Sequence, residues 1–288
     1  MLDVEVQKKL VPINIQKTIS VIILNRCGKK IYDSNILGKP MKSWVESSVK
    51  EYPYIILDYD SKQESKVFVK PHLKPSDYTL VLYSNTPLIT KGVIKHLIEF
   101  ATIKESVACK LPVGYIVQTE YLLKAKEIMF DSMYNFNLEA FYEINNKQDV
   151  SYVSQKLSKR INSFYMNNGV EIENIDTVLI EPSVKISSGV TIFSHVVLKG
   201  DTIIDSGSII KENSVVIDSI IGKDCLVSSS NVTNSTLGDN VCIGSFCEII
   251  DACLREEVVV GRYSIISGRT IRKKTSIPER STLVKSKE

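Results

Sequence analysis

The sequence predicts an α/β domain followed by a parallel β-helix. The main observation is a six-residue period: between residues 180 and 283 an aliphatic residue returns at every sixth position, with occasional slips. A small or β-branched residue follows most of them four positions later. Such a period is typical of a solenoid with three hexads per triangular coil, and we expect about six coils. The residues predicted to point inward in the first coils are Ile180, Ile186, Ile192, Leu198, Ile204, Ile210 and Val216.

The first half alternates strand-like and helix-like segments. Buried-strand patterns lie at residues 18–24, 54–57, 78–83 and 113–117. Helical spacing follows at residues 39–49, 90–101 and about 122–129, and Thr90 is suited to cap the second of these helices. This alternation favours an α/β layer built on a mainly parallel sheet.

A further helix is expected between the two halves. Asp149 is the predicted N-cap, an apolar stripe runs from Val153 to Phe164, and Gly169 stands where the helix should stop. The expected organisation is therefore an α/β domain over residues 1–148, a linker helix over 149–169 and a β-helix over 170–288.

Composition excludes several classes of protein. The 288 residues are 43% hydrophobic with a net charge of +3, and the longest apolar run near the N-terminus is Val21–Leu24, so we expect no membrane span. The six cysteines form no C-x-x-C pair, which favours a reducing, cytoplasmic location. Because no aromatic residue interleaves the basic residues after Tyr263, we expect no nucleic-acid partner.

Several motifs resemble those of a known family. They are Gly38-Lys-Pro-Met41, Thr86-Pro-Leu-Ile-Thr90, Ile144-Asn-Asn146, the segment 159–170 and the hexads from Ser235 to Phe246. The chain thereby resembles the bacterial bifunctional N-acetylglucosamine-1-phosphate uridylyltransferase/glucosamine-1-phosphate acetyltransferase family, as a degenerate and truncated homologue. The resemblance implies a Rossmann-like nucleotidyltransferase domain, a left-handed β-helix of hexapeptide repeats and a homotrimer.

The resemblance also implies candidate site residues. In that family a Gly-rich loop after the first strand holds UTP, while an Asp and an Asn hold the Mg²⁺ that neutralises developing charge. Asn145 stands at the position of the second metal ligand. The positions that correspond to nucleotide or sugar-phosphate binding are Leu24, Arg26, Gly28, Lys29, Lys39, Asn85 and Thr86.

This sequence departs from the family pattern at three places. The loop from Leu24 to Lys30 is short and has a single glycine, and Asn85 stands where the family has its metal-binding Asp. No base-reading segment is found between Tyr59 and Asp77. An amide oxygen is a poor Mg²⁺ ligand compared with a carboxylate. We therefore expect nucleotidyl transfer to be impaired or lost, with Mg²⁺ as cofactor only if some transfer survives.

The acetyltransferase chemistry of the family is expected to be missing, because its H-L-x-Y coil does not appear in the sequence. His195 lies at a hexad turn, where many hexapeptide acyltransferases place a general base.

The sequence leaves three readings open. One is a uridylyltransferase-related enzyme, and the second is a non-catalytic trimeric scaffold or binding protein for a uridine nucleotide or sugar phosphate. The third is a hexapeptide acyltransferase that uses His195.

Overall fold

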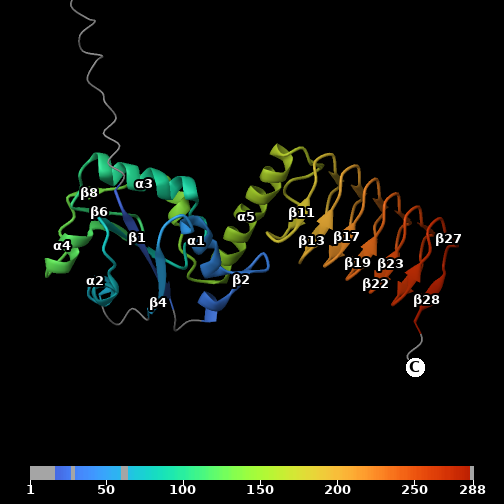
Figure 1. Cartoon of the computed structure of the whole chain (residues 1–288), viewed down its shortest axis with the longest axis horizontal. Coiled ribbons are helices and arrows are strands. Elements are labelled where there is room, and N and C mark those ends of the chain that lie inside the picture. The colour runs from blue at the N-terminus through green and yellow to red at the C-terminus, as the bar shows by residue number, and fades with distance from the viewer. Residues whose placement is uncertain (1–16, 27–29, 60–63, 286–288) are drawn as a thin grey trace, which may run out of the picture. The chain divides into compact units, whose positions relative to one another are not determined.

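The computed structural model describes residues 17–26, 30–59 and 64–285. It divides into two compact units, shown in Figure 1. The first contains residues up to Ser34 and from Met41 to Asn145, and the second contains Asn35–Pro40 and everything from Asn146 onward. A short hairpin, β2 (Asn35–Ile36) with β3 (Lys39–Pro40), thus interrupts the first unit and packs with the second.

The first unit is a three-layer α/β structure around a six-stranded sheet. The strand order is β4-β1-β5-β7-β6-β8. The strands are β1 (Ile19–Arg26), β4 (Tyr54–Tyr59), β5 (Tyr78–Tyr83), β6 (Ala108–Lys110), β7 (Tyr115–Gln118) and β8 (Ser132–Met133). The helices are α1 (Met41–Val49), α2 (Ser65–Val69), α3 (Lys91–Ile103) and α4 (Thr119–Lys124), with short 3₁₀ turns η2 (Lys30–Asp33), η3 (Lys70–His72) and η4 (Leu138–Phe141).

Strand β1 lies between β4 and β5 and is apolar on both of its faces. Ile19, Val21 and Ile23 pack with residues of α1 and α3, whereas Ile22 and Leu24 pack with residues of α2 and α4. Helices therefore cover both faces, which explains why the strand is a continuous hydrophobic run instead of an alternating one.

The sheet is mixed: β4-β1-β5 and the pair β6-β8 are parallel, so the prediction of a mainly parallel sheet holds for three of the five strand pairs. Strand β7 is antiparallel to both β5 and β6. The cause is a tight turn at residues 111–114, closed by a hydrogen bond from Leu111 N–H to Gly114 O (3.2 Å). Gly114 has φ +99°, and a Cβ there would lie 2.2 Å from Val81 O, so the turn requires glycine.

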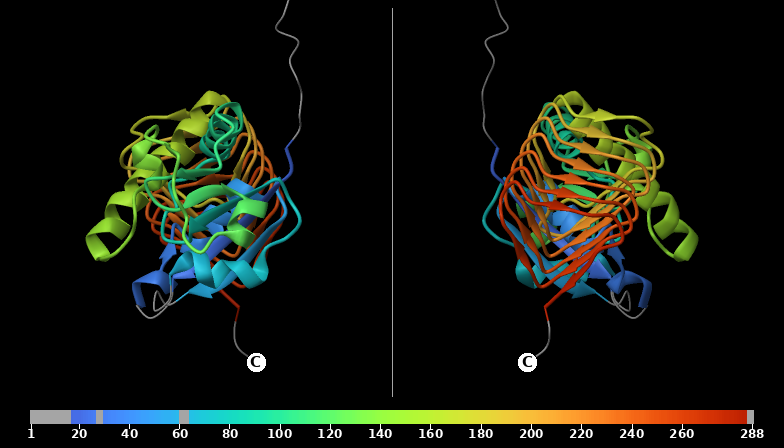
Figure 2. Two further views of the ribbon diagram at one scale, coloured as in Figure 1. Left: turned by 90° about the vertical axis from the view of Figure 1, so that its left-hand side faces the viewer. Right: turned by 90° about the vertical axis from the view of Figure 1, so that its right-hand side faces the viewer.

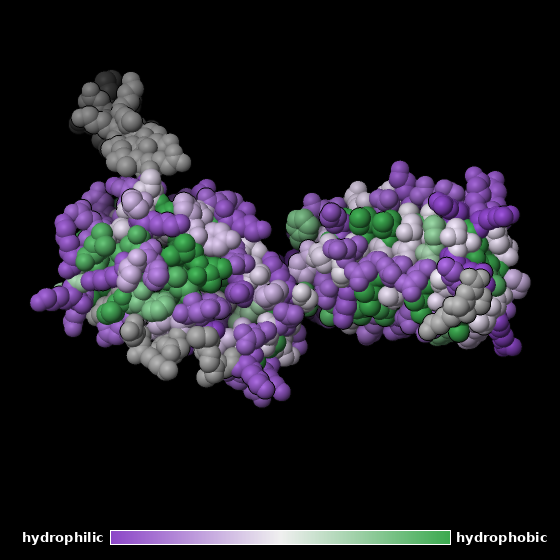
Figure 3. Space-filling view, turned by 60° about the horizontal axis from the view of Figure 1, so that its bottom comes forward, coloured by the Kyte–Doolittle hydropathy of each residue, from purple (hydrophilic) through white to green (hydrophobic). Residues whose placement is uncertain are grey.

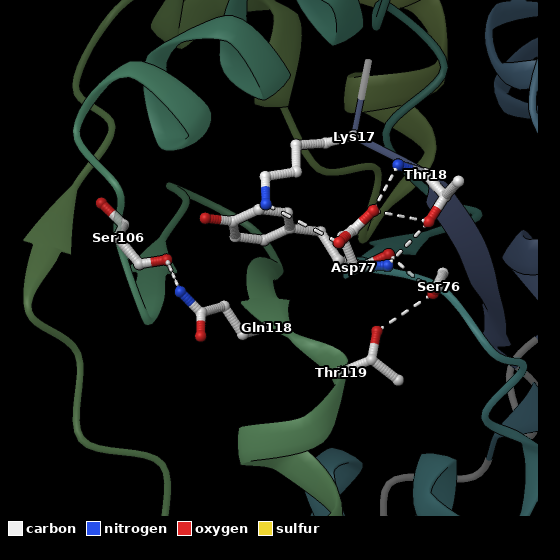
Figure 4. A network of polar contacts seen from close by, with 8 residues as sticks. Lys17, Thr18, Ser76, Asp77, Ser106, Gln118 and Thr119 are labelled. Atoms are coloured by element: carbon white, nitrogen blue, oxygen red, sulfur yellow. Dashed lines mark hydrogen bonds and ion pairs between the residues drawn. The ribbon is translucent and has the colours of Figure 1, made fainter. Parts of the chain in front are cut away.

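Polar side chains join the amino ends of β1 and β5 (Figure 4). The Asp77 carboxylate accepts hydrogen bonds from Thr18 N–H (2.8 Å) and Thr18 Oγ1 (2.7 Å) and lies 3.7 Å from Lys17 Nζ. Hydrogen bonds from the Thr18 backbone and side chain hold the pKa of Asp77 below its usual value. Ser76 Oγ lies 3.0 Å from Thr119 Oγ1, so the network extends to the end of β7.

Helix α5 (Lys147–Asn167) begins the continuous part of the second unit. Its N-cap is Asn146 and not Asp149, so that prediction is wrong. Asn146 Oδ1 accepts from the backbone N–H of Asp149, and the Asp149 carboxylate accepts from Asn146 N–H, which makes a capping box. Gly169, at φ +85°, follows the helix end as expected.

The rest of the second unit is a parallel β-helix with three flat faces, seen end-on at the right of Figure 2. The first face has β10 (Leu179–Ile180), β13 (Val197–Lys199), β16 (Val215–Ile217), β19 (Asn231–Thr233), β22 (Glu248–Ile250), β25 (Ile265–Ser267) and β28 (Thr282–Val284). The second face has β11 (Lys185–Ile186), β14 (Ile203–Ile204), β17 (Ile220–Ile221), β20 (Thr236–Leu237), β23 (Cys253–Leu254) and β26 (Thr270–Ile271). The third face has β9 (Glu171–Ile172), β12 (Thr191–Ile192), β15 (Ile209–Ile210), β18 (Leu226–Val227), β21 (Cys242–Ile243), β24 (Val259–Val260) and β27 (Ser276–Ile277).

The predicted inward residues form the core of this β-helix. Ile180, Leu198 and Val216 occupy equivalent positions in successive coils and are fully buried. Ile186, on the second face, is only partly buried and packs against the core. Two faces carry seven strands and the other carries six, so the β-helix has nearly seven coils where about six were expected.

Candidate functional site

The candidate site lies at the carboxyl ends of the parallel strands. Strand β1 is flanked by β4 and β5, so the chain leaves β1 toward one side and later returns to the other. Ligands of open α/β sheets bind outside the carboxyl ends of the strands at such a switch point. Ser84 N–H donates to Leu24 O (3.0 Å), and Ile144 N–H donates to Asn85 O (2.8 Å). These bonds bring the segments around residues 24–26, 84–86 and 143–145 together.

Arg26 is the last residue of β1 and is fixed from three directions. Its backbone N–H donates to Ser84 Oγ (3.1 Å), and its guanidinium lies over the Tyr83 ring at 4.9 Å from the centroid. Arg26 Nη2 is 3.3 Å from Glu143 Oε1, and the two side chains are 28% and 30% exposed. Arg26 Nε is buried and has no hydrogen-bond partner within the described part of the chain.

Asn85 is fully buried directly after the end of β5. Its Nδ2 donates to Glu143 Oε1 (3.3 Å) and Ile144 O (3.2 Å), so the amide fastens the 143–144 segment to the sheet edge. Its Oδ1 is buried without a hydrogen-bond partner among the residues that the structure describes. A carboxylate in this position could not donate these bonds and would face Glu143 as a like charge.

Aromatic rings line the same end of the sheet. The Tyr59 ring lies 6.0 Å from the Tyr83 ring and 5.4 Å from the Phe68 ring. Tyr115 begins β7 beside the end of β5, and burial raises the pKa of its hydroxyl. At the outer strand, Asn25 Nδ2 donates to Asp58 Oδ1 (2.7 Å). This edge of the sheet thus carries one guanidinium, two side-chain amides and several aromatic rings.

The other residues predicted from the sequence lie in different parts of the chain. Leu24 and Thr86 are buried at this edge, and Thr86 Oγ1 donates to Tyr83 O (2.8 Å), so both support the backbone. Asn145 is exposed and follows Ile144. Lys39 belongs to the second unit, beside a hollow lined also by Leu37, Gly38, Glu181, Pro182 and Ser183. Gly28 and Lys29 lie outside the described residues.

Glu143 is a site residue that the sequence reasoning missed. It contacts Arg26 and Asn85, which are distant in sequence, and this pairing cannot be read from local patterns. The available signal was its position as an acidic residue directly before the buried Ile144 of Ile144-Asn-Asn.

The arrangement does not fit a Mg²⁺ ion. Within residues 17–26, 30–59 and 64–285, no three His, Cys, Asp or Glu side chains are grouped so that they could hold a metal. A Mg²⁺ ion about 2.1 Å from Glu143 Oε1 would lie within about 5.5 Å of the Arg26 guanidinium. At that separation the two cations repel by about 6 kcal/mol at an effective dielectric constant of about 20, and by less where water screens them. The Arg26 guanidinium therefore opposes the binding of a metal ion at Glu143.

His195 is an exposed residue at a corner of the β-helix, with φ +59°. Its backbone N–H donates to Thr177 Oγ1 (3.3 Å). In the preceding coil, Glu173 Oε2 accepts from Ser194 Oγ (2.6 Å) and Ser194 N–H (3.0 Å), and these bonds, with the charge of His195, lower the pKa of Glu173. The Glu173 carboxylate is therefore hydrogen-bonded to Ser194. The role of His195 as a general base stays a prediction.

The C-terminal repeats match a family model. The model described as "GlmU-like, C-terminal hexapeptide" matches residues 210–286, which supports the left-handed β-helix of hexapeptide repeats. The bifunctional protein GlmU of Streptococcus thermophilus is 26% identical over 263 residues, covering 68% of this chain and 57% of that protein. The bifunctional protein GlmU of Streptococcus equi subsp. zooepidemicus is 34% identical over 126 residues, covering 43% of this chain and 27% of that protein.

The chain is thus similar to bifunctional GlmU proteins, and its C-terminal repeats match a GlmU-like family model. It spans little more than half the length of the first GlmU relative that it matches. Among solved structures, 2-C-methyl-D-erythritol 4-phosphate cytidylyltransferase from Thermus thermophilus covers 49% of this chain with 11% identity and a TM-score of 0.40. The acetyltransferase domain of PglB from Neisseria gonorrhoeae covers 93% with 15% identity and a TM-score of 0.35. At these TM-scores the two likenesses support no statement about activity.

Proposed function

We propose that this GlmU-like protein binds a sugar nucleotide or uridine nucleotide at the carboxyl edge of its sheet and has lost Mg²⁺-dependent nucleotidyl transfer. The observation that carries the proposal is the environment of Asn85. Its amide group donates to Glu143 and Ile144, so it serves as a fastening residue at the place where the family has a metal-binding Asp.

The physical reason for lost transfer is electrostatic. Mg²⁺ holds its waters tightly and is usually bound through carboxylates together with substrate phosphates. The carboxylate beside Asn85 is that of Glu143, and it is already paired with Arg26 and Asn85. Removing one preorganised charge-stabilising group from a transition state typically costs about 2.7–4 kcal/mol, a loss of roughly two to three decades in rate.

We further propose that the β-helix assembles the protein into a homotrimer. On the third face, Ile209, Leu226, Cys242 and Val259 form an outward column on successive coils, and Ile209 and Val259 are 37% and 46% exposed. On the second face, Ile203 and Ile220 lie at equivalent positions, and hydrophobic patches appear between the charged residues of the β-helix in Figure 3. Apolar columns on flat solenoid faces favour association by closed symmetry.

We also propose a cytoplasmic location, on the basis of the cysteines. Cys109, Cys225, Cys242, Cys247 and Cys253 are free thiols, as a reducing compartment would keep them. None of the described helices is long and apolar enough to cross a membrane.

The test combines a binding and an activity measurement. Calorimetric titration with UDP-N-acetylglucosamine should show binding, while pyrophosphate release from UTP and N-acetylglucosamine 1-phosphate with Mg²⁺ should stay at background. Robust pyrophosphate release by the wild type would contradict the loss of transfer and restore the transferase reading. If neither ligand binding nor pyrophosphate release is detected, nucleotide binding is refuted. The β-helix would then act as a trimeric scaffold. Light scattering that returns a monomer mass at micromolar concentration would refute the trimer.

A further inference from the structure

The carboxyl edge of the sheet carries a cation of its own in Arg26. We propose that Arg26 takes the place of a divalent metal in this chain, so that the α/β unit binds the diphosphate group of a ligand without a metal ion. This inference rests on the proposed nucleotide binding and specifies how the anion is held.

The position of Arg26 suits this role because the side chain is held before a ligand arrives. The Tyr83 ring supports one face of the guanidinium at 4.9 Å, and Glu143 Oε1 fixes Nη2 at 3.3 Å. A guanidinium has five N–H donors in a planar fork, and one ion-pair contact leaves most of them for an acceptor. Such a fork binds phosphate oxygens in pairs, which a lysine ammonium cannot do.

A second, independent observation also indicates a ligand. Buried side-chain polar atoms nearly always have a hydrogen-bond partner, and exceptions call for an explanation. Two such exceptions in the described chain, Arg26 Nε and Asn85 Oδ1, belong to residues that contact the same oxygen of Glu143. One is a cationic donor and the other a neutral acceptor. They match a ligand that presents an anionic oxygen beside an N–H or O–H group, as a sugar nucleotide does.

Glu143 distinguishes a metal-free site from a metal site. If Arg26 holds the anion, the Glu143 carboxylate repels the same anion, and Glu143→Gln should tighten binding. If a metal bridges the protein and the ligand, Glu143 is the available carboxylate ligand, and Glu143→Gln should weaken binding. The two arrangements therefore predict changes of opposite sign.

The experiment is calorimetric titration with inorganic pyrophosphate and with UDP-N-acetylglucosamine, each in EDTA and in Mg²⁺. We expect both probes to bind in EDTA. Arg26→Gln should reduce the affinity for pyrophosphate about 10- to 100-fold, as expected for lost charge-assisted hydrogen bonds. Arg26→Lys should fall between Arg26→Gln and the wild type, and Glu143→Gln should bind at least about threefold more tightly. Lys74→Gln removes the same charge from an exposed position outside this site and should leave binding unchanged.

Three results would overturn the inference. One is binding that requires Mg²⁺, which leaves nucleotide binding itself intact. Another is weaker binding by Glu143→Gln, and the third is equal loss for Arg26→Gln and Lys74→Gln. Absence of binding in all four conditions would refute the proposed nucleotide binding as well. Thermal melts of each variant confirm that it is folded. If Arg26→Gln unfolds, the sign of the affinity change in Glu143→Gln still decides between the two arrangements.

Discussion

Leu198→Ala tests the packing of the β-helix core. Leu198 is fully buried and stacks between Ile180 of the coil before and Val216 of the coil after. The substitution removes three buried carbons, worth about 0.8 kcal/mol each by transfer, and leaves a cavity in a stack whose strands are held by hydrogen bonds. We expect a total destabilisation of about 3 kcal/mol, within the range measured for buried Leu→Ala changes.

The assay is thermal unfolding followed by circular dichroism, with Lys199→Ala as the matched control on the same strand. For a unit of this size, about 3 kcal/mol lowers Tm by roughly 6–12 °C. The Lys199 side chain is half-buried on the outer side, so its truncation should change stability by no more than about 0.5 kcal/mol. A Leu198→Ala protein that melts within about 2 °C of the wild type would show that the inward assignment is wrong.

Three other predictions follow from particular side chains. Asn85→Asp places a second carboxylate beside Glu143, so this variant should melt several degrees lower than the wild type in EDTA. It should recover stability in Mg²⁺. Equal melting temperatures of the variant in both buffers would contradict the contact between residues 85 and 143. Because the pKa of Asp77 is lowered by its Thr18 hydrogen bonds, its stabilising contribution is present above about pH 4 and is lost as pH falls through the lowered pKa. The Tm difference between wild type and Asp77→Asn should therefore shrink between pH 6 and pH 2.5. A Tm difference that stays constant would contradict the stabilising role of the Thr18–Asp77 hydrogen bonds. Burial raises the pKa of Cys225 to about 11, so a maleimide at pH 8 should spare Cys225. It should modify Cys242 in a monomer but not in the proposed trimer, and rapid labelling of Cys225 in the native protein would be inconsistent with its buried position.

The β-helix could be predicted from the sequence because its core is local and periodic. The aliphatic residue that returns at every sixth position, such as Leu198 or Ile204, is fully buried as expected, and so is the small or β-branched residue four positions later, such as Thr202. The slips in the period are absorbed at the corners, since the register continues from Ile204 to Ile221 and Leu237 despite unequal coil lengths.

The sheet and the site were harder to predict because they depend on contacts between distant residues. Strand direction at β7 follows from the turn at Gly114 and its close approach to Val81, and apolar periodicity is the same for either direction. Arg26 and Asn85 could be proposed from motifs, but their meeting at Glu143 joins segments more than fifty residues apart. The sequence indicated that a metal-binding Asp is replaced, and the structure adds that the replacement is hydrogen-bonded in its new environment.

The most direct test of the central claim is a crystal structure with UDP-N-acetylglucosamine and Mn²⁺, in which anomalous scattering locates the metal. We predict the diphosphate within hydrogen-bonding distance of the Arg26 guanidinium and no manganese peak at Asn85 or Glu143. A manganese ion coordinated by Asn85 Oδ1 or by the Glu143 carboxylate, with Arg26 displaced from Glu143, would contradict the account.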